Sequence, residues 1–169
     1  MRKFAPVLGV DLGGVVIRSA GGDGDTGLLG DEWLDTPAVD GCIDVLARLT
    51  AALFDMRVVI ISKAGPKIQQ RSREWLEHAD FFARTGIGPT NLVFVRERRD
   101  KAGACRRWHV THFVDDHVGV LQHLTTVPHR YLFTGGSGAS TSPQQVPPGI
   151  EVADSWTTVE ELLRRTVPN

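Results

Sequence analysis

The sequence predicts an α/β protein, a single-domain Rossmann-like three-layer α/β/α fold with a five-stranded, mostly parallel sheet. Short runs rich in Val, Leu and Ile alternate along the chain with segments in which apolar residues recur every three or four positions. Each run ends in a polar or turn-forming cluster, and such strand–helix alternation gives a parallel sheet covered on both faces. The 169 residues suffice for one ordinary domain, residues 1–169.

The five expected strands are short and rich in β-branched residues. They cover residues 7–10, 57–61, 92–95, 112–114 and 130–133. The core is therefore expected to span residues 5–133.

Helices are expected between these strands and at the end of the chain. Apolar residues recur with helical spacing from Val39 to Leu53, and again from Pro66 to Ala79, where proline stands in a position that a first helical turn accepts. Shorter helices are expected over residues 102–108 and 117–124. A capping box at Thr157 to Glu160 indicates a C-terminal helix over residues 156–166. The Gly-, Ser- and Pro-rich residues 134–149 are expected to be a flexible loop.

Composition excludes several classes of protein. A formal net charge of -1 leaves no overall basic excess, so no nucleic-acid partner is indicated. We find no run that could span a bilayer, and Asp11 breaks the apolar stretch near the start, so no membrane partner and a cytoplasmic location are expected. Only two cysteines occur, Cys42 and Cys105, both in helical segments, which indicates neither a disulfide framework nor a paired-cysteine zinc site.

Polar residues follow the ends of the predicted strands, where the chemistry of an open parallel sheet takes place. They are Asp11, Ser62, Lys63, the segment from Arg96 to Lys101, Asp115 and Asp116. Three carboxylates at one edge would repel each other, and a divalent cation resolves that repulsion. Oxygen ligands without histidine favour Mg²⁺.

In these positions the sequence resembles the haloacid dehalogenase superfamily, whose members have a Rossmann-like core and hydrolyse substrates through a phosphoaspartate. The likeness runs from Val7 to about Phe133. The superfamily's first motif, D-x-D-x-T/V, resembles "DLGGV" from Asp11. Its second motif matches Ser62, its third matches Lys101, and its acidic pair matches Asp115 and Asp116.

The resemblance implies a phosphatase that transfers the phosphoryl group to Asp11 and requires Mg²⁺. In this interpretation Ser62, Lys101, Gly13 and Gly14 bind the phosphoryl oxygens, and Lys101 also assists catalysis. The metal ligands are then Asp11, the Gly13 carbonyl, Asp116 directly, and Asp115 from further out or through water.

The first motif departs from the superfamily pattern. Gly13 stands where a second Asp is expected, and that Asp protonates the leaving oxygen and later deprotonates the attacking water. Similar glycine variants occur in phosphatase-like branches. His117 and Lys63 are the residues that could supply an acid and base instead.

The intervals between the motifs leave no room for a full cap module. The resemblance is thus to a capless or minimal-cap branch, whose open site suits a bulky phosphoester or a phosphorylated small molecule covered by a second subunit in a homodimer. The loop around Trp33 and Leu34 could then act as a lid.

Two hypotheses follow for the function. The first is a Mg²⁺-dependent phosphomonoester hydrolase or phosphotransferase. The alternative is a catalytically weak or inactive domain that binds a phosphorylated ligand or partner. The absence of a carboxylate at Gly13 favours the alternative, and the presence of Asp11 favours the enzyme, because binding alone would not need a nucleophile.

Overall fold

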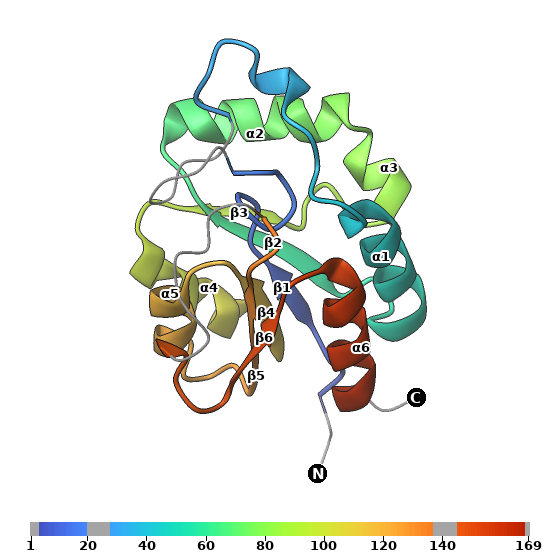
Figure 1. The fold of residues 1–169 in the computed structure, drawn as a ribbon, viewed down its shortest axis with the longest axis vertical. Coiled ribbons are helices and arrows are strands. Elements are labelled where there is room, and N and C mark those ends of the chain that lie inside the picture. The colour runs from blue at the N-terminus through green and yellow to red at the C-terminus, as the bar shows by residue number, and fades with distance from the viewer. Residues whose placement is uncertain (1–3, 20–27, 137–144, 168–169) are drawn as a thin grey trace.

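The fold is a parallel sheet flanked by helices in a Rossmann-like arrangement (Figure 1). The computed structural model describes residues 4–19, 28–136 and 145–167. The strands pair in the order β3-β2-β1-β4-β5-β6, and all neighbours are parallel. Their bounds are β1 Leu8–Val10, β2 Val58–Lys63, β3 Leu92–Val95, β4 His112–Asp115, β5 His129–Phe133 and β6 Ile150–Ala153.

The prediction of five strands is wrong, because the sheet has six. Strand β6 adds to the edge beside β5, with Leu132 opposite Val152. It is four residues long and buries only its two ends, Ile150 and Ala153. Such a short, half-exposed edge strand carries little apolar signal. Of the loop predicted over 134–149, residues 137–144 lie outside the described part of the chain.

Alternating strand residues face two helical layers. Val58 and Ile60 belong to one buried cluster, and Val59 and Ile61 belong to the other. The first cluster is covered by α1 Cys42–Arg48, α2 Pro66–His78, α3 Phe81–Thr85 and α6 Trp156–Thr166, and the second by α4 Lys101–Arg107 and α5 Val118–His123. Figure 1 shows α1 and α6 on one side of the strands and α4 and α5 on the other.

Two helical predictions differ in detail from the structure. The stripe expected from Val39 to Leu53 is α1 followed by a π-helical segment, η2 Leu49–Leu53, and Val39 precedes the helix in an extended segment. The cap of α6 is Ser155, whose side chain accepts a hydrogen bond from the N–H of Thr158 at 3.2 Å. The capping box expected at Thr157 is wrong because the helix begins one residue before it.

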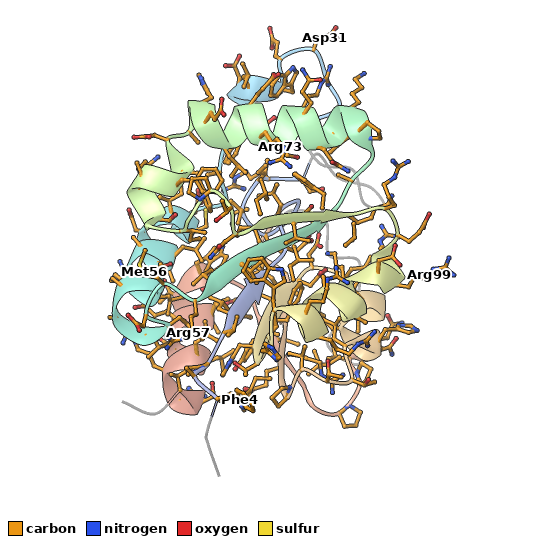
Figure 2. The ribbon with its side chains drawn as sticks, turned by 180° about the vertical axis from the view of Figure 1, so that it is seen from behind. Phe4, Asp31, Met56, Arg57, Arg73 and Arg99 are labelled. Atoms are coloured by element: carbon orange, nitrogen blue, oxygen red, sulfur yellow. The ribbon has the colours of Figure 1, made fainter. Side chains whose placement is uncertain are left out.

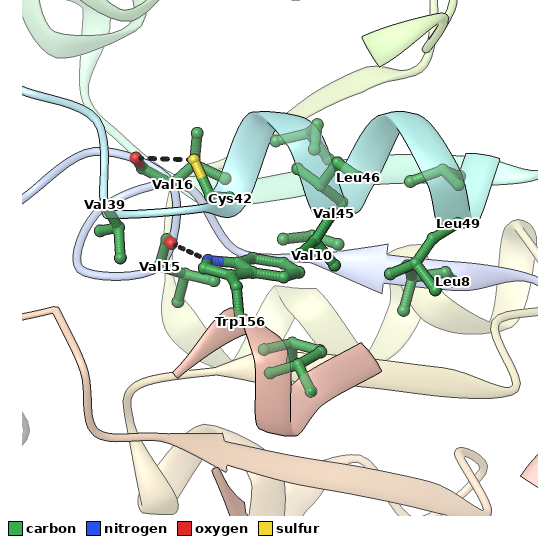
Figure 3. Close-up of a cluster of buried hydrophobic side chains, with 14 of the residues drawn as sticks. Leu8, Val10, Val15, Val16, Val39, Cys42, Val45, Leu46, Leu49 and Trp156 are labelled. Carbon is green, nitrogen blue, oxygen red and sulfur yellow. Dashed lines mark hydrogen bonds between the residues drawn. The ribbon is translucent and has the colours of Figure 1, made fainter. Parts of the chain in front are cut away.

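Trp156, the first residue of α6, lies inside the larger cluster between α1 and β1 (Figure 3). Cys42 is buried in the same cluster and Cys105 in the other, and burial raises the pKa of each thiol to about 12. Both cysteines are therefore unreactive packing residues. Among the described residues, no helix is both long and apolar enough to cross a membrane.

Candidate active site

The sheet topology brings the first-strand and fourth-strand carboxylates together. Strands β1 and β4 are neighbours, with Val10 opposite Val114, so Asp11 and Asp115 follow at the same level. The N–H of Asp11 donates to the Val114 carbonyl at 3.0 Å. The chain passes outward through β2 and β3 and returns to start β4 on the other side of β1, which makes this edge the switch point where α/β proteins bind ligands.

Lys101 joins the two carboxylates from the first position of α4. Its Nζ lies 2.9 Å from Oδ1 of Asp11 and 2.7 Å from Oδ2 of Asp115. The side chain is only 3% exposed. Burial alone would lower the pKa of Lys101, but the charges of Asp11 and Asp115 outweigh it and hold that pKa above its ordinary value. The ammonium therefore stays charged between its partners.

The three carboxylates form a compact cluster. One oxygen from each of Asp11, Asp115 and Asp116 lies within 4.8 Å of the others. Burial, followed by the charge of Asp11, raises the pKa of Asp115 to about 6 and that of Asp116 to about 9. One lysine therefore does not neutralise the cluster, and a divalent cation held by oxygen ligands would.

Asp115 is already occupied by hydrogen bonds from the protein. One of its oxygens accepts from Lys101 and the other from the N–H of His117 at 2.9 Å. Asp116 is half-buried. That Asp116 binds the metal directly and Asp115 from further out stays a prediction. The hydrogen bonds that Asp115 already accepts supply a physical reason for it.

The glycine loop after Asp11 is tightly folded. The N–H groups of Val16 and Ile17 both donate to the Leu12 carbonyl, at 2.9 and 3.0 Å, and Gly14 donates to Ile17 at 2.8 Å. Gly14 has φ of 74°, and a Cβ there would meet the carboxylate of Asp116. Glycine is thus required at position 14 for two reasons: the positive φ is unfavourable for other residues, and a side chain would collide with Asp116. Gly13 bridges to Ile17, and the metal contact of its carbonyl stays a prediction.

Two supports of this loop were missed in the sequence. The indole N–H of Trp156 donates to the Val15 carbonyl at 2.9 Å, and Gly136 packs so closely on the Gly14 carbonyl that a Cβ would collide with it (Figure 3 shows the first). Ser19 then donates its N–H to the Gly136 carbonyl at 3.2 Å. The paired glycines at 135 and 136, which follow the end of β5 after one intervening residue, were the available signal, since glycine near a strand end often marks a close backbone approach.

The remaining predicted residues lie at the same edge. Ser62 is buried near the end of β2 and makes no side-chain hydrogen bond to a described residue. Lys63 and His117 are exposed, and the ring of His117 lies beside Gly119, where a Cβ would be 3.2 Å from it. Phosphate binding by Ser62 and acid–base roles for Lys63 and His117 stay predictions.

The expected lid residues lie on a short 3-10 helix, η1 Trp33–Asp35, that packs on α2. The guanidinium of Arg71 lies 5.4 Å from the centre of the Trp33 ring, and Trp75 donates its indole N–H to the Thr36 carbonyl at 2.9 Å. Leu34 is exposed. The segment is therefore attached to α2, and its action as a lid stays a prediction.

Among the solved structures with a similar fold is that of D,D-heptose 1,7-bisphosphate phosphatase from Burkholderia thailandensis. The TM-score is 0.64, with 18% sequence identity over 94% of this chain and 98% of that one. The similarity confirms the Rossmann-like α/β fold. Membership of the haloacid dehalogenase superfamily stays a prediction. The capless branch and the glycine motif variant stay predictions. No protein-family model and no curated protein sequence matches the chain.

Proposed function

We propose that this protein is a Mg²⁺-dependent phosphatase that acts through a phosphoaspartate at Asp11. The observation that supports it most is the placement of Lys101 between Asp11 and Asp115 at 2.9 and 2.7 Å, with Asp116 completing an acidic cluster at the switch point of the sheet. A nucleophile beside a fixed cation is the arrangement that phosphoryl transfer needs.

The donor set fits Mg²⁺. Carboxylate oxygens of Asp11 and Asp116, with Asp115 behind them, are hard ligands. Burial, followed by the charge of Asp11, raises the pKa values of Asp115 and Asp116, and a bound cation would favour their ionised forms. When bound, Mg²⁺ supplies positive charge that offsets the negative charge of the phosphoryl group.

In the first half-reaction an Asp11 oxygen attacks phosphorus, and the bond from phosphorus to the ester oxygen breaks with its electron pair leaving on that oxygen. Lys101 orients Asp11 through the 2.9 Å contact. In the second half-reaction water attacks the phosphorus of the acyl phosphate, which releases inorganic phosphate and restores the Asp11 carboxylate. The Ser62 hydroxyl is proposed to donate to a phosphoryl oxygen in both steps.

A second candidate function is supported by Gly13. With no side chain there, the first motif lacks the carboxylate that would move protons in both half-reactions. The same cluster could then serve a weak or inactive domain that binds a phosphorylated ligand. The enzyme is the stronger proposal because Asp11 remains in contact with Lys101.

The deciding experiment is a screen of phosphorylated small molecules in Mg²⁺ and in excess chelator, with Asp11→Asn as the matched variant. We expect Mg²⁺-dependent phosphate release that falls by about 10⁴-fold or more in Asp11→Asn, because the amide is a poor nucleophile. Full turnover in chelator would exclude the metal, and full turnover by a folded Asp11→Asn chain would exclude the phosphoaspartate. Binding without turnover would favour the second candidate.

We further propose that the substrate is a phosphorylated small molecule or bulky phosphoester, that a second copy of the chain could cover the open site, and that the protein is cytoplasmic. Size-exclusion chromatography with light scattering, with and without substrate, tests the second copy.

A further inference from the structure

The sheet ends on one side at β3, and no strand of residues 4–19, 28–136 or 145–167 pairs with the outer side of that strand. The Asn91 carbonyl, directly before β3, accepts from the Ile60 N–H at 2.8 Å, so the backbone of Asn91 is directed toward β2. Backbone groups of successive strand residues point to opposite sides. The N–H and C=O groups of Leu92 and Phe94 therefore face the free side, where another strand could pair with them.

The sequence of β3 lacks the features that usually prevent such pairing. Its four residues, Leu92–Val95, are all apolar, and three of them are only half-buried. Natural edge strands are commonly protected by a charged residue or a proline, and β3 contains neither. The opposite edge of the sheet is protected in both ways, because β6 carries the exposed Glu151 and follows Pro147 and Pro148. Of the two edges, β3 is thus the one suited to bind another strand.

Helices α2 and α4 border β3 on its two faces. Figure 2 shows the strand between them, on the side of the molecule toward the viewer. The guanidinium of Arg73, on α2, lies 5.1 Å from the centre of the Phe94 ring. The chain returns along α2 from the carboxyl end of β2 toward the amino end of β3, so Glu77, one turn after Arg73 on the same face, lies nearer that amino end.

Arg73 and Glu77 are both exposed, and neither forms an ion pair with a described residue. The α2 side of the free edge therefore has a positive charge toward the carboxyl end of β3 and a negative charge toward its amino end. Such an edge is complementary to a copy of itself that runs in the opposite direction.

We propose that β3 pairs antiparallel with β3 of a second copy of this chain, so that the two sheets join into one. With Val93 opposite the partner's Val93, the outward N–H and C=O groups of Leu92 meet those of the partner's Phe94. A twofold axis perpendicular to the sheet keeps both α2 helices on one face and brings Arg73 next to the partner's Glu77. In a parallel pair the helices would lie on opposite faces, and these charges would not meet.

The antiparallel arrangement keeps other like charges apart. Arg96 follows β3 directly, and the exposed Arg98 and Arg99 belong to the 3-10 helix that comes next, η3 Arg98–Asp100. These arginines lie beyond the carboxyl end of β3, and the carboxyl ends of two antiparallel strands point away from each other. The acidic clusters of the two copies lie at opposite ends of the joined sheet for the same reason. The pairing therefore does not cover the site, and it rests neither on substrate nor on the proposed function.

Sedimentation velocity of the full chain without substrate tests the pairing. We expect a dimer whose share rises with protein concentration, and hydrogen exchange at Leu92 and Phe94 that slows as the dimer forms, because their N–H groups become hydrogen-bonded. Arg73→Glu and Glu77→Arg should each raise the dimer dissociation constant about tenfold or more, since the twofold axis places like charges together at two points. The two substitutions combined should restore the dimer, because the opposite charges then meet again.

Glu161→Arg is the matched control. It makes the same change of charge at an exposed residue of α6, a helix that contacts β5 and β6 at the other side of the sheet, and should leave the dimer unchanged. A chain that stays monomeric at millimolar concentration would overturn the proposal and leave the edge to a strand of another protein. A dimer that the combined variant does not restore, or in which Leu92 and Phe94 keep exchanging rapidly, would place the interface elsewhere. Dimers that form only with substrate would support a cover over the site and contradict pairing at β3.

Discussion

Gly13 has no side chain at the position where the superfamily motif has its second Asp, and this affects both proposed half-reactions. A positioned acid or base contributes about 10² to 10⁴ in rate. We expect aryl, acyl and anomeric sugar phosphates, whose leaving oxygens are more acidic than that of a simple alcohol, to react much faster than primary alkyl phosphates. The phosphoaspartate should also accumulate and give a burst of product in rapid-mixing experiments.

Absence of a burst, with rates that barely depend on leaving-group acidity, would mean that another residue moves the protons. His117→Ala and Lys63→Ala then identify it. The variant that gains both the burst and the steep leaving-group dependence has lost the acid–base group.

Gly14 is the residue at which the loop and the acidic cluster meet. A Cβ at this position would meet the Asp116 carboxylate, and the φ of 74° is unfavourable for alanine. We expect Gly14→Ala to lower the free energy of unfolding by about 1–2 kcal/mol. It should also weaken Mg²⁺ binding at least tenfold, measured by calorimetry. Gly30→Ala is the control, because Gly30 has open space around its Cα and should change neither quantity.

At the scale of elements, α6 stabilises the glycine loop after Asp11 through Trp156. Its indole donates to the buried Val15 carbonyl at 2.9 Å (Figure 3). Trp156→Phe keeps most of the apolar volume but leaves that carbonyl without its donor, so we expect a loss of about 1–3 kcal/mol in the free energy of unfolding and a lower kcat.

Trp75→Phe is the matched control in the same experiment. Its indole N–H also donates to a loop carbonyl at 2.9 Å, but that carbonyl belongs to Thr36, which directly follows η1. Comparable destabilisation with kcat retained is expected for this variant. Equal losses of kcat in both variants would show that general destabilisation, and not the loss of support for the glycine loop, causes the effect.

The strands and α2 were predicted from the sequence to within one or two residues, except β6, and α1 begins at Cys42 instead of Val39. The run "VVII" fixes β2 because all four side chains are buried, and the stripe that includes Trp75 and Leu76 fixes α2. Strand β6 was missed because half of its residues are half-buried or exposed, and η3 was missed because nothing in "RERRD" is apolar. Helix caps and the pairing of edge strands depend on polar groups, so the spacing of apolar residues in the sequence indicates them only weakly.

The sequence predicted those residues of the candidate site that lie at or near the ends of strands. Asp11, Lys101, Asp115 and Asp116 do come together. That Lys101 would contact Asp11, 90 residues before it, and that Trp156 would support the Val15 carbonyl, 141 residues before it, depends on packing between segments far apart in sequence. The close approach of Gly136 to Gly14 depends on such packing too. Those contacts have no local signal in the sequence.

At the scale of the whole molecule, the amino edge of the sheet has its own titratable group. His112 is buried, its ring nitrogens contact the hydroxyls of Thr111 and Thr166 at 2.7 and 3.0 Å, and its ring stacks on His129. Burial, aided by His129, lowers the pKa of His112 from 6.5 to about 3. Above pH 6.5 the imidazole is neutral in both the folded and the unfolded chain, so its contribution is fully present.

Between pH 6.5 and 3 the unfolded chain binds a proton at His112 that the folded chain does not. The free energy of unfolding should therefore fall by up to about 1.4 kcal/mol per pH unit in this window. Urea denaturation at pH 7.5, 5.5 and 4.5 measures the slope, and His112→Gln should flatten it. An unchanged slope in that variant would assign the pH dependence to other groups.

The hydrogen bond from Trp156 to Val15 joins residues 141 positions apart, and it sets the order in which a newly made chain could become active. Every residue proposed to touch substrate or metal, Asp11 to His117, precedes α6 in the chain and is therefore synthesised before it. Until α6 packs against α1 and β1, the glycine loop lacks its indole donor. A nascent chain that ends before residue 156 would therefore carry the complete chemical set and still fail to hold it in place, so activity should begin only when synthesis reaches the last helix.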